Sequence, residues 1–248
     1  MAWAYFFDID GTLVDLAATP SAVHPDSDIR RLVHGLYSVT GGAVALISGR
    51  SLADIDRLFP RVRLPAAGQH GLERRDATGR LHSHPIPEGS LDSVRAQLRE
   101  AVARHHGLLI EDKGLSLALH YRSVPRLAGF AHRLMRTLQT ELGNGYCVQP
   151  GKRVVELKPA GRDKGVAILE FMEEAPFRGR IPVFVGDDAT DEYGFAVVNG
   201  LGGHSVKVGA GQTAASCRLG DVSAVRAWLN SLETIPALKA ELNPRAIR

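Results

Sequence analysis

Apolar and polar residues follow one another along the chain in blocks that predict strands and helices in turn. Residues 3–9 are almost continuously apolar, which is typical of a strand buried on both faces of a parallel sheet. Apolar positions three and four apart predict a helix over residues 28–38, and residues 43–47 form a second apolar run. Ser51 and Asp54 have the spacing of a helix start. This order of elements favours an α/β fold with a parallel sheet.

The middle of the chain has a different pattern. Apolar stripes predict helices over residues 91–102 and 127–142. Residues 108–110 and 115–121 resemble the two strands of an antiparallel hairpin, with Lys113-Gly114 between them. Two further short strands, 146–148 and 154–157, are expected on either side of Pro150-Gly151. Residues 85–157 are therefore predicted to form a small α+β unit.

The first pattern then returns. Helices are expected over residues 166–172, 190–198 and 222–232, and short strands over 181–185 and 206–208. The prediction is a split α/β core, residues 1–84 and 158–248, with the smaller α+β domain, residues 85–157, inserted into it.

Composition and charge narrow the possible classes of function. The 248 residues are 44% hydrophobic, which excludes wholesale disorder, and no apolar stretch of about 18 residues could span a membrane. The net charge is +3, but the basic residues are scattered and do not alternate with aromatic ones, so a nucleic-acid partner is not expected. The start of the chain lacks the basic region of a signal peptide. With two cysteines that have no metal-binding spacing, we expect a cytoplasmic protein with reduced thiols.

Two carboxylates directly follow the first predicted strand. Asp8 and Asp10 lie two residues apart, and Gly11 permits the chain to curl so that both approach one ligand. In open α/β sheets, ligands bind beyond the carboxyl ends of the strands. Taken alone, such a pair could equally be two solvated acids in a loop with no ligand.

Three further segments occupy comparable positions. Residues 48–50, Ser-Gly-Arg, follow the second strand, Lys164 opens a predicted helix, and the acid-rich residues 186–192 follow the strand 181–185. Each segment alone has an ordinary explanation as a turn, a solvated lysine or a helix cap. Their order and their shared position at strand ends make coincidence a poor explanation.

This arrangement resembles the haloacid dehalogenase (HAD) superfamily of phosphohydrolases, with its four motifs in order. Residues 7–13, 46–50, 68–73, 120–122, 151–156 and 186–192 are moreover similar to the pattern of the trehalose-6-phosphate phosphatase family. The resemblance implies a HAD-like Rossmannoid core with a parallel sheet. The 116 residues between Ser48 and Lys164 leave a surplus of about 75 over a connecting βα unit, and this surplus resembles the superfamily's α/β cap.

The resemblance implies the catalytic residues. Asp8 would be the nucleophile that forms an aspartyl-phosphate. Asp10 would protonate the leaving sugar oxygen and then serve as general base for water. Ser48 and Lys164 would hold the non-reacting phosphate oxygens, assisted by backbone N–H groups around Gly11 and Gly49.

The same resemblance implies a Mg²⁺ cofactor, because a hard cation relieves the repulsion between carboxylates and phosphate. Asp8 and Asp187 would supply carboxylates, and Asp10 its backbone carbonyl. Asp188 and Asp191 would bind the ion directly or orient its waters, and the sequence does not separate these possibilities.

Substrate specificity is expected in the cap, which would close over the core. Lys113, Arg122, Lys152 and Glu156 are candidates for reading the hydroxyls of a disaccharide. The alternative for Lys113 and Arg122 is that of solvated charges at a sheet edge. Arg50 and His70 are candidates at the junction with the cap, although His70 fits a structural hydrogen-bonding role equally well.

The leading hypothesis is a Mg²⁺-dependent phosphatase that hydrolyses trehalose 6-phosphate to trehalose and phosphate, a step of trehalose biosynthesis. The alternatives are another capped HAD phosphatase, acting on sucrose phosphate, a glycosyl-phosphoglycerate or a hexose phosphate, and a non-catalytic sugar-phosphate sensor. The expected partner is a small phosphorylated disaccharide. Nothing in the sequence indicates a nucleic acid, a membrane or an obligate protein partner.

Overall fold

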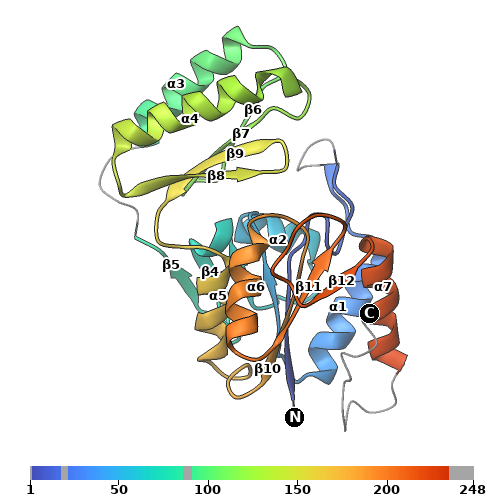
Figure 1. The fold of residues 1–248 in the computed structure, drawn as a ribbon. Coiled ribbons are helices and arrows are strands. Elements are labelled where there is room, and N and C mark those ends of the chain that lie inside the picture. Colours follow the sequence, from blue (N-terminus) through green and yellow to red (C-terminus); the bar gives the residue numbers. More distant parts are fainter. Residues whose placement is uncertain (1, 18–21, 86–90, 235–248) are drawn as a thin grey trace. The chain divides into compact units, whose positions relative to one another are not determined.

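The computed structural model describes residues 2–17, 22–85 and 91–234 (Figure 1). The chain forms two compact units, which we call the core unit (residues 1–83 and 163–248) and the inserted unit (residues 84–162). The sequence pattern put the boundaries after residues 84 and 157. The second boundary falls later because the last strand of the inserted unit continues through Lys158 and Pro159.

The core unit consists of a mixed eight-stranded sheet with helices on both faces. Its strands are β1 (Trp3–Phe7), β2 (Val44–Ile47), β3 (Ala66–Gly68), β4 (Glu73–Arg75), β5 (Leu81–Ser83), β10 (Ile181–Gly186), β11 (His204–Val208) and β12 (Cys217–Leu219). Its helices are α1 (Ser27–Val39), α2 (Leu52–Leu58), α5 (Lys164–Met172), α6 (Asp191–Gly200) and α7 (Val222–Thr234). The strand order is β12-β11-β10-β1-β2-β3-β4-β5. All neighbours are parallel as far as β3, and β4 and β5 add an antiparallel edge.

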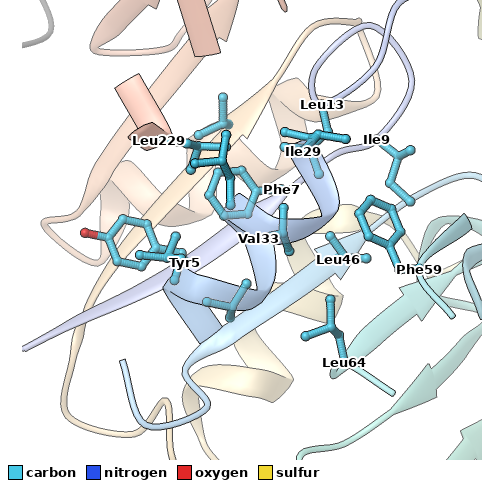
Figure 2. Packing of buried hydrophobic residues seen from close by; sticks show 14 of the residues in the cluster. Tyr5, Phe7, Ile9, Leu13, Ile29, Val33, Leu46, Phe59, Leu64 and Leu229 are labelled. Carbon is cyan, nitrogen blue, oxygen red and sulfur yellow. The ribbon is translucent and has the colours of Figure 1, made fainter. Parts of the chain in front are cut away.

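The central strands are apolar throughout because both of their faces are covered. Tyr5 and Phe7 of β1 pack into one hydrophobic cluster with residues of α1, α2 and α7, and Figure 2 shows the Phe7 ring near Ile29 and Val33 of α1. Phe6 points the other way, into a second cluster with residues of α5 and α6. Figure 1 shows the same division of helices between the two faces of the sheet. The expected parallel sheet with a buried N-terminal strand is thus confirmed.

Short polar side chains set where the helices of the core unit begin. The Ser51 hydroxyl accepts a hydrogen bond from the Asp54 N–H at 3.1 Å, so α2 starts where the sequence predicted. Asp163 caps α5 by accepting from the Val166 N–H at 2.9 Å. This cap fixes Lys164 as the first residue of α5. Among the described residues, no helix has both the length and the apolar character needed to cross a membrane.

The inserted unit has a sheet, two main helices and a hydrophobic cluster of its own. Its elements are α3 (Leu91–Arg104), β6 (Leu109–Asp112), β7 (Leu117–His120), α4 (Ala128–Leu142), β8 (Tyr146–Gly151) and β9 (Val154–Pro159). The strand order is β6-β7-β9-β8, all antiparallel. Both α3 and α4 lie on one face of this sheet (Figure 1). Leu117 and Leu157 of that face pack against Leu98 and Met135 of the helices.

One expected turn was wrong. Pro150 and Gly151 do not separate β8 from β9 but belong to β8, where they pair with Val155 and Val154. The chain instead reverses direction at residues 152–153, where Arg153 adopts a positive φ of +62°. Proline is tolerated in β8 because this strand lies at the edge of the sheet.

The other face of the inserted sheet carries polar side chains. Glu111 lies opposite Ala118, Ala118 lies opposite Glu156, and Glu156 lies opposite Gln149. Because side chains alternate along a strand, all four share one face. We call this the polar face. Its polar members are Glu111, His120, Gln149, Glu156 and Lys158, and Leu109, Ala118, Cys147 and Val154 lie on the same face.

Candidate active site

The three strand ends singled out from the sequence lie side by side. Asp8 follows β1, Ser48 follows β2 and Asp187 follows β10. These strands are neighbours in the order β10-β1-β2 and run parallel, so their carboxyl ends meet at one edge of the sheet. The location matches the edge at which open α/β sheets bind ligands.

Lys164 joins two of the acidic residues. Its Nζ lies 2.8 Å from Asp8 Oδ1 and 2.7 Å from Asp191 Oδ1, and all three side chains are buried. Burial alone would lower the pKa of Lys164, but the carboxylates of Asp191 and Asp8 outweigh it and raise that pKa well above its ordinary value. Lys164 is therefore a fixed positive charge beside Asp8.

Asp8, Asp187 and Asp191 form a buried group of carboxylates with ligand oxygens within 4.8 Å of one another. Burial raises the pKa of Asp8 well above its ordinary value, and the carboxylates of Asp191 and Asp187 raise it further against the opposing effect of Lys164. Asp8 and Asp191 thus share the Lys164 ammonium group, and Asp187 is a third carboxylate beside them. An all-oxygen set with excess negative charge suits a hard divalent cation such as Mg²⁺, so these residues fit the expected cofactor.

The loop between β10 and α6 is organised by its own acidic side chains. Asp191 Oδ2 accepts hydrogen bonds from the N–H groups of Asp187 at 2.8 Å and of Asp188 at 2.9 Å. Asp188 Oδ1 accepts from the N–H and the hydroxyl of Thr190, both at 2.7 Å. Burial opposes ionisation of Asp188, but Lys164 and Thr190 outweigh it and lower its pKa. Asp191 is thereby both a member of the carboxylate group and the scaffold of its loop.

Asp10 and Arg50, expected in separate roles, pair with each other. Arg50 Nε lies 2.6 Å from Asp10 Oδ2, and Arg50 Nη2 lies 2.6 Å from Asp10 Oδ1. This bidentate geometry is the strongest form of carboxylate–guanidinium contact. Both oxygens of the expected general acid accept hydrogen bonds here, so Asp10 must exchange partners before it can donate a proton.

Ser48 and the segment before β4 support each other. The Ser48 hydroxyl accepts from the Arg50 N–H at 3.2 Å, and the Ser48 carbonyl accepts from the His70 N–H at 3.0 Å. Gln69 and His70 both have positive φ values, 47° and 57°, an uncommon conformation for residues with a side chain. A Cβ at Gly49 would lie 2.7 Å from His70 Nε2, so Gly49 makes room for the imidazole ring. His70 thus lies directly against the loop that carries Ser48.

Gly11 gives the first prediction. Its φ is +84°, and a Cβ there would lie 2.1 Å from Asp187 Oδ2. We expect Gly11→Ala to lower the free energy of unfolding by about 1–3 kcal/mol and to reduce activity by displacing the Asp187 carboxylate. Urea unfolding and phosphate release measure the two effects. Gly79→Ala is the matched control, since Gly79 has a φ of +86° with no atom within 4 Å. Equal activity of the two variants would show that the contact with Asp187 is unimportant.

The structure brings two of the cap candidates into direct contact. Lys113 Nζ lies 2.8 Å from Glu156 Oε2, and the Ser116 hydroxyl donates to Glu156 Oε1 at 2.6 Å. Both charged side chains are buried, with exposed fractions of 9% and 6%. Lys113 is therefore not the solvated edge charge of the alternative interpretation. The contact places a carboxylate and an ammonium group together at one end of the polar face.

Arg122 and Lys152 meet at the opposite end of β7, where Arg122 Nη2 donates to the Lys152 carbonyl at 3.2 Å. Sequence reasoning missed a further pair on the polar face. His120 Nε2 lies 2.8 Å from Glu111 Oε2. Burial would raise the pKa of Glu111, but the hydrogen bond with His120 and the charge of Lys113 lower it below its ordinary value. Strand alternation and register together would have placed Glu111 on the same face as Glu156, with Ala118 between them.

With this geometry established, comparison with known proteins decides the family. A family model described as trehalose-phosphatase matches residues 6–223. The chain belongs to the trehalose-phosphatase family. It is 45% identical over 241 residues to the trehalose-6-phosphate phosphatase of Escherichia coli K12, covering 97% of this chain and 90% of the relative. It is also 43% identical over 207 residues to a probable trehalose-phosphate phosphatase of Sinorhizobium fredii, covering 84% and 78%.

Solved structures agree with the trehalose-phosphatase family in fold. The C-terminal domain of trehalose-6-phosphate phosphatase from C. albicans superposes with a TM-score of 0.83 at 22% identity, covering 95% of this chain and 93% of that one. A trehalose-6-phosphate phosphatase related protein superposes with a TM-score of 0.75 at 27% identity, covering 94% and 97%. The predicted family and the α/β fold class are therefore confirmed.

Proposed function

We propose that this chain is a Mg²⁺-dependent phosphatase that hydrolyses trehalose 6-phosphate to trehalose and phosphate. Family membership supports the substrate, and one observation in the structure supports the chemistry above all. Lys164 lies between Asp8 and Asp191 at the carboxyl ends of β1 and β10, so a nucleophilic carboxylate stands next to a fixed positive charge.

In the proposed reaction, a carboxylate oxygen of Asp8 attacks phosphorus and the sugar oxygen leaves, which gives an aspartyl-phosphate. Lys164 and the Ser48 hydroxyl bind the non-reacting oxygens, and backbone N–H groups near Gly11 and Gly49 assist. Water then cleaves the aspartyl-phosphate and regenerates Asp8. A Mg²⁺ ion held by Asp8 and Asp187, with Asp191 beside them, would neutralise the acidic group and the phosphate. The backbone carbonyl of Asp10 and the Asp188 carboxylate stay candidates for its remaining sites.

Asp10 is proposed to act as the general acid and then as the general base. It protonates the departing sugar oxygen and then removes a proton from the attacking water. Because Arg50 occupies both of its oxygens, the proposal requires Arg50 to turn from Asp10 toward the substrate. This single movement would free Asp10 to act as acid and base and would bring Arg50 into contact with the substrate.

The inserted unit is proposed to act as the cap that reads the sugar. Glu156, Lys113 and Ser116 supply adjacent acceptors and donors on the polar face, an arrangement that suits neighbouring hydroxyls. Arg122, Lys152 and His70 are further proposed contacts. We also propose a cytoplasmic location, in keeping with the free thiols of Cys147 and Cys217.

The function is tested with purified protein, Mg²⁺ and a panel of phosphate esters. Trehalose 6-phosphate is expected to give the highest kcat/KM, ahead of sucrose 6-phosphate, glucosyl-3-phosphoglycerate and glucose 6-phosphate. Absence of phosphate release from trehalose 6-phosphate in the presence of Mg²⁺ would overturn the proposal. A higher kcat/KM for another ester would support a phosphatase activity but would show that trehalose 6-phosphate is not the preferred substrate.

A second prediction separates proton donation from nucleophilic attack. Asp10→Asn is expected to lower kcat on trehalose 6-phosphate by about 10²–10⁴-fold, because the sugar alkoxide needs a proton to leave. With p-nitrophenyl phosphate, whose leaving group needs no proton, the first step should survive. Stopped-flow absorbance would then show a burst of one p-nitrophenolate per protein, followed by slow turnover. Absence of a burst with p-nitrophenyl phosphate would remove Asp10 from the role of acid, because the first step would then be lost whatever the leaving group.

A third prediction concerns the polar face. Glu156→Gln keeps the shape of the side chain but removes the charge that pairs with Lys113. We expect KM for trehalose 6-phosphate to rise by roughly 10-fold or more, with kcat for p-nitrophenyl phosphate unchanged because that ester has no sugar. Glu100→Gln, on the exposed side of α3, is the matched control. An unchanged KM in Glu156→Gln would argue against a sugar contact.

A further inference from the structure

A second buried lysine lies behind the carboxylate group. Lys207 of β11 is 5% exposed, and its Nζ donates a hydrogen bond to the backbone carbonyl of Asp187. The parallel register places Lys207 directly beside Gly186, the last residue of β10. None of the short segments that resemble the family's pattern, such as residues 186–192, contains this lysine.

The position of Lys207 in the strand makes its charge unexpected. It lies between Val206 and Val208, in a parallel strand whose described neighbours are largely buried. Burying an ammonium group is costly, and lysine is almost never fully buried without a compensating contact. An aliphatic side chain would satisfy the packing needs of such a strand, so the ammonium group calls for another explanation.

Both main-chain polar groups of Asp187 are held by side chains. Its N–H donates to Asp191 Oδ2 at 2.8 Å, and its carbonyl accepts from Lys207. With both peptide groups fixed, the direction of the Cα–Cβ bond is fixed as well. The Asp187 carboxylate is thereby held within 4.8 Å of the carboxylates of Asp8 and Asp191.

We propose that Lys207 is a positioning residue that acts through the backbone of Asp187 to hold the Asp187 carboxylate ready for a divalent cation. The inference rests on the proposed function only in that Asp187 is taken as a Mg²⁺ ligand. Lys207 is assigned no contact with substrate or with the reacting atoms.

Positioning and simple electrostatics predict opposite results when Lys207 is removed. An ammonium group near a cation site repels the cation, so loss of its charge alone should tighten Mg²⁺ binding. Loss of the hydrogen bond should instead free the Asp187 backbone and weaken binding. The sign of the change in Mg²⁺ affinity therefore distinguishes the two effects.

The experiment measures Mg²⁺ binding to metal-free protein by isothermal titration calorimetry, with no substrate present. Lys207→Met is expected to raise the Kd for Mg²⁺ by roughly 10-fold or more, and Lys207→Arg, which restores a charged donor, to recover part of the loss. Arg218→Met is the matched control. Arg218 lies opposite Lys207 on β12 and donates to the carbonyls of Gly209 and Gly211, away from the acids.

Unfolding curves accompany each titration, which is made at a temperature where every variant is folded. A merely structural Lys207 would lower the unfolding midpoint and leave the Kd unchanged, and that result would overturn the inference. Tighter binding by Lys207→Met would overturn it in favour of electrostatic repulsion. If the wild-type protein itself bound no Mg²⁺, the proposed cation site would fail, and that outcome is distinct from a failure of Lys207 alone.

Discussion

Asp8→Asn is expected to reduce phosphate release from trehalose 6-phosphate by roughly 10⁴-fold or more. An amide oxygen is a far weaker nucleophile than a carboxylate, so the covalent step is lost while the volume of the side chain is preserved. The change also removes one of three clustered, buried acids, and burial already raises the pKa of Asp8, so the folded protein should not lose stability. A large loss of activity in a stable protein is thus the signature of a nucleophile.

The assay measures phosphate release under saturating Mg²⁺, together with thermal unfolding. Asp15→Asn is the matched control, because it makes the same change seven residues along the chain, at an exposed position. Wild-type protein quenched in acid during turnover should carry one phosphate, and Asp8→Asn should carry none. If Asp8→Asn retained wild-type kcat, no covalent mechanism through Asp8 could stand.

Lys164→Met is expected to cost both activity and stability. Removing the ammonium group leaves Asp8 and Asp191 facing each other without their shared partner. Loss of one member of a buried ion pair costs about 3–5 kcal/mol, and the lost phosphate contact should reduce kcat/KM by about 10³-fold. Chemical unfolding in the absence of Mg²⁺ and steady-state kinetics measure the two effects.

The stability loss in Lys164→Met should depend on pH in a defined direction. Without Lys164, the pKa of Asp8, already raised by burial, rises further, so the folded state binds protons more tightly than the unfolded state. The loss is therefore expected to be largest at neutral pH and to shrink as pH falls toward the ordinary range of carboxyl groups. Arg226→Met, which breaks the more exposed pair with Asp26, should change stability by less than about 1 kcal/mol. A loss in Lys164→Met that did not vary with pH would contradict this account.

The sequence predicted the parts of the fold that carry a periodic signal. The long apolar runs of β1, β2 and β10 and the stripes of α1, α4 and α7 are confirmed by the structure. The short strands β3, β4, β5 and β12 were not predicted. Each has three residues, too few for a period to show, and each is defined by its pairing with a neighbouring strand.

Some features of the candidate site could likewise be predicted from the sequence, and others could not. Strand ends and motif order placed Asp8, Ser48 and Asp187 at one edge, because parallel neighbours bring their carboxyl ends together whatever their side chains do. The pairing of Asp10 with Arg50 could not be predicted, since it depends on the conformations of two side chains 40 residues apart. Lys207 was missed for a related reason. Its contact with Asp187 depends on the register of β10 and β11, which no local pattern encodes.

The separate hydrophobic cluster of the inserted unit bears on how this enzyme can evolve. Among the described residues, the side chains that hold α3 and α4 against their sheet all belong to that unit, and they occupy the face opposite Glu111 and Glu156. If the polar face reads the sugar, as proposed above, mutations there would alter which sugar is accepted without loosening the packing of α3 and α4 on the other face of the sheet. On that proposal, selection would be able to change substrate preference while the proposed catalytic residues of the core unit stay the same.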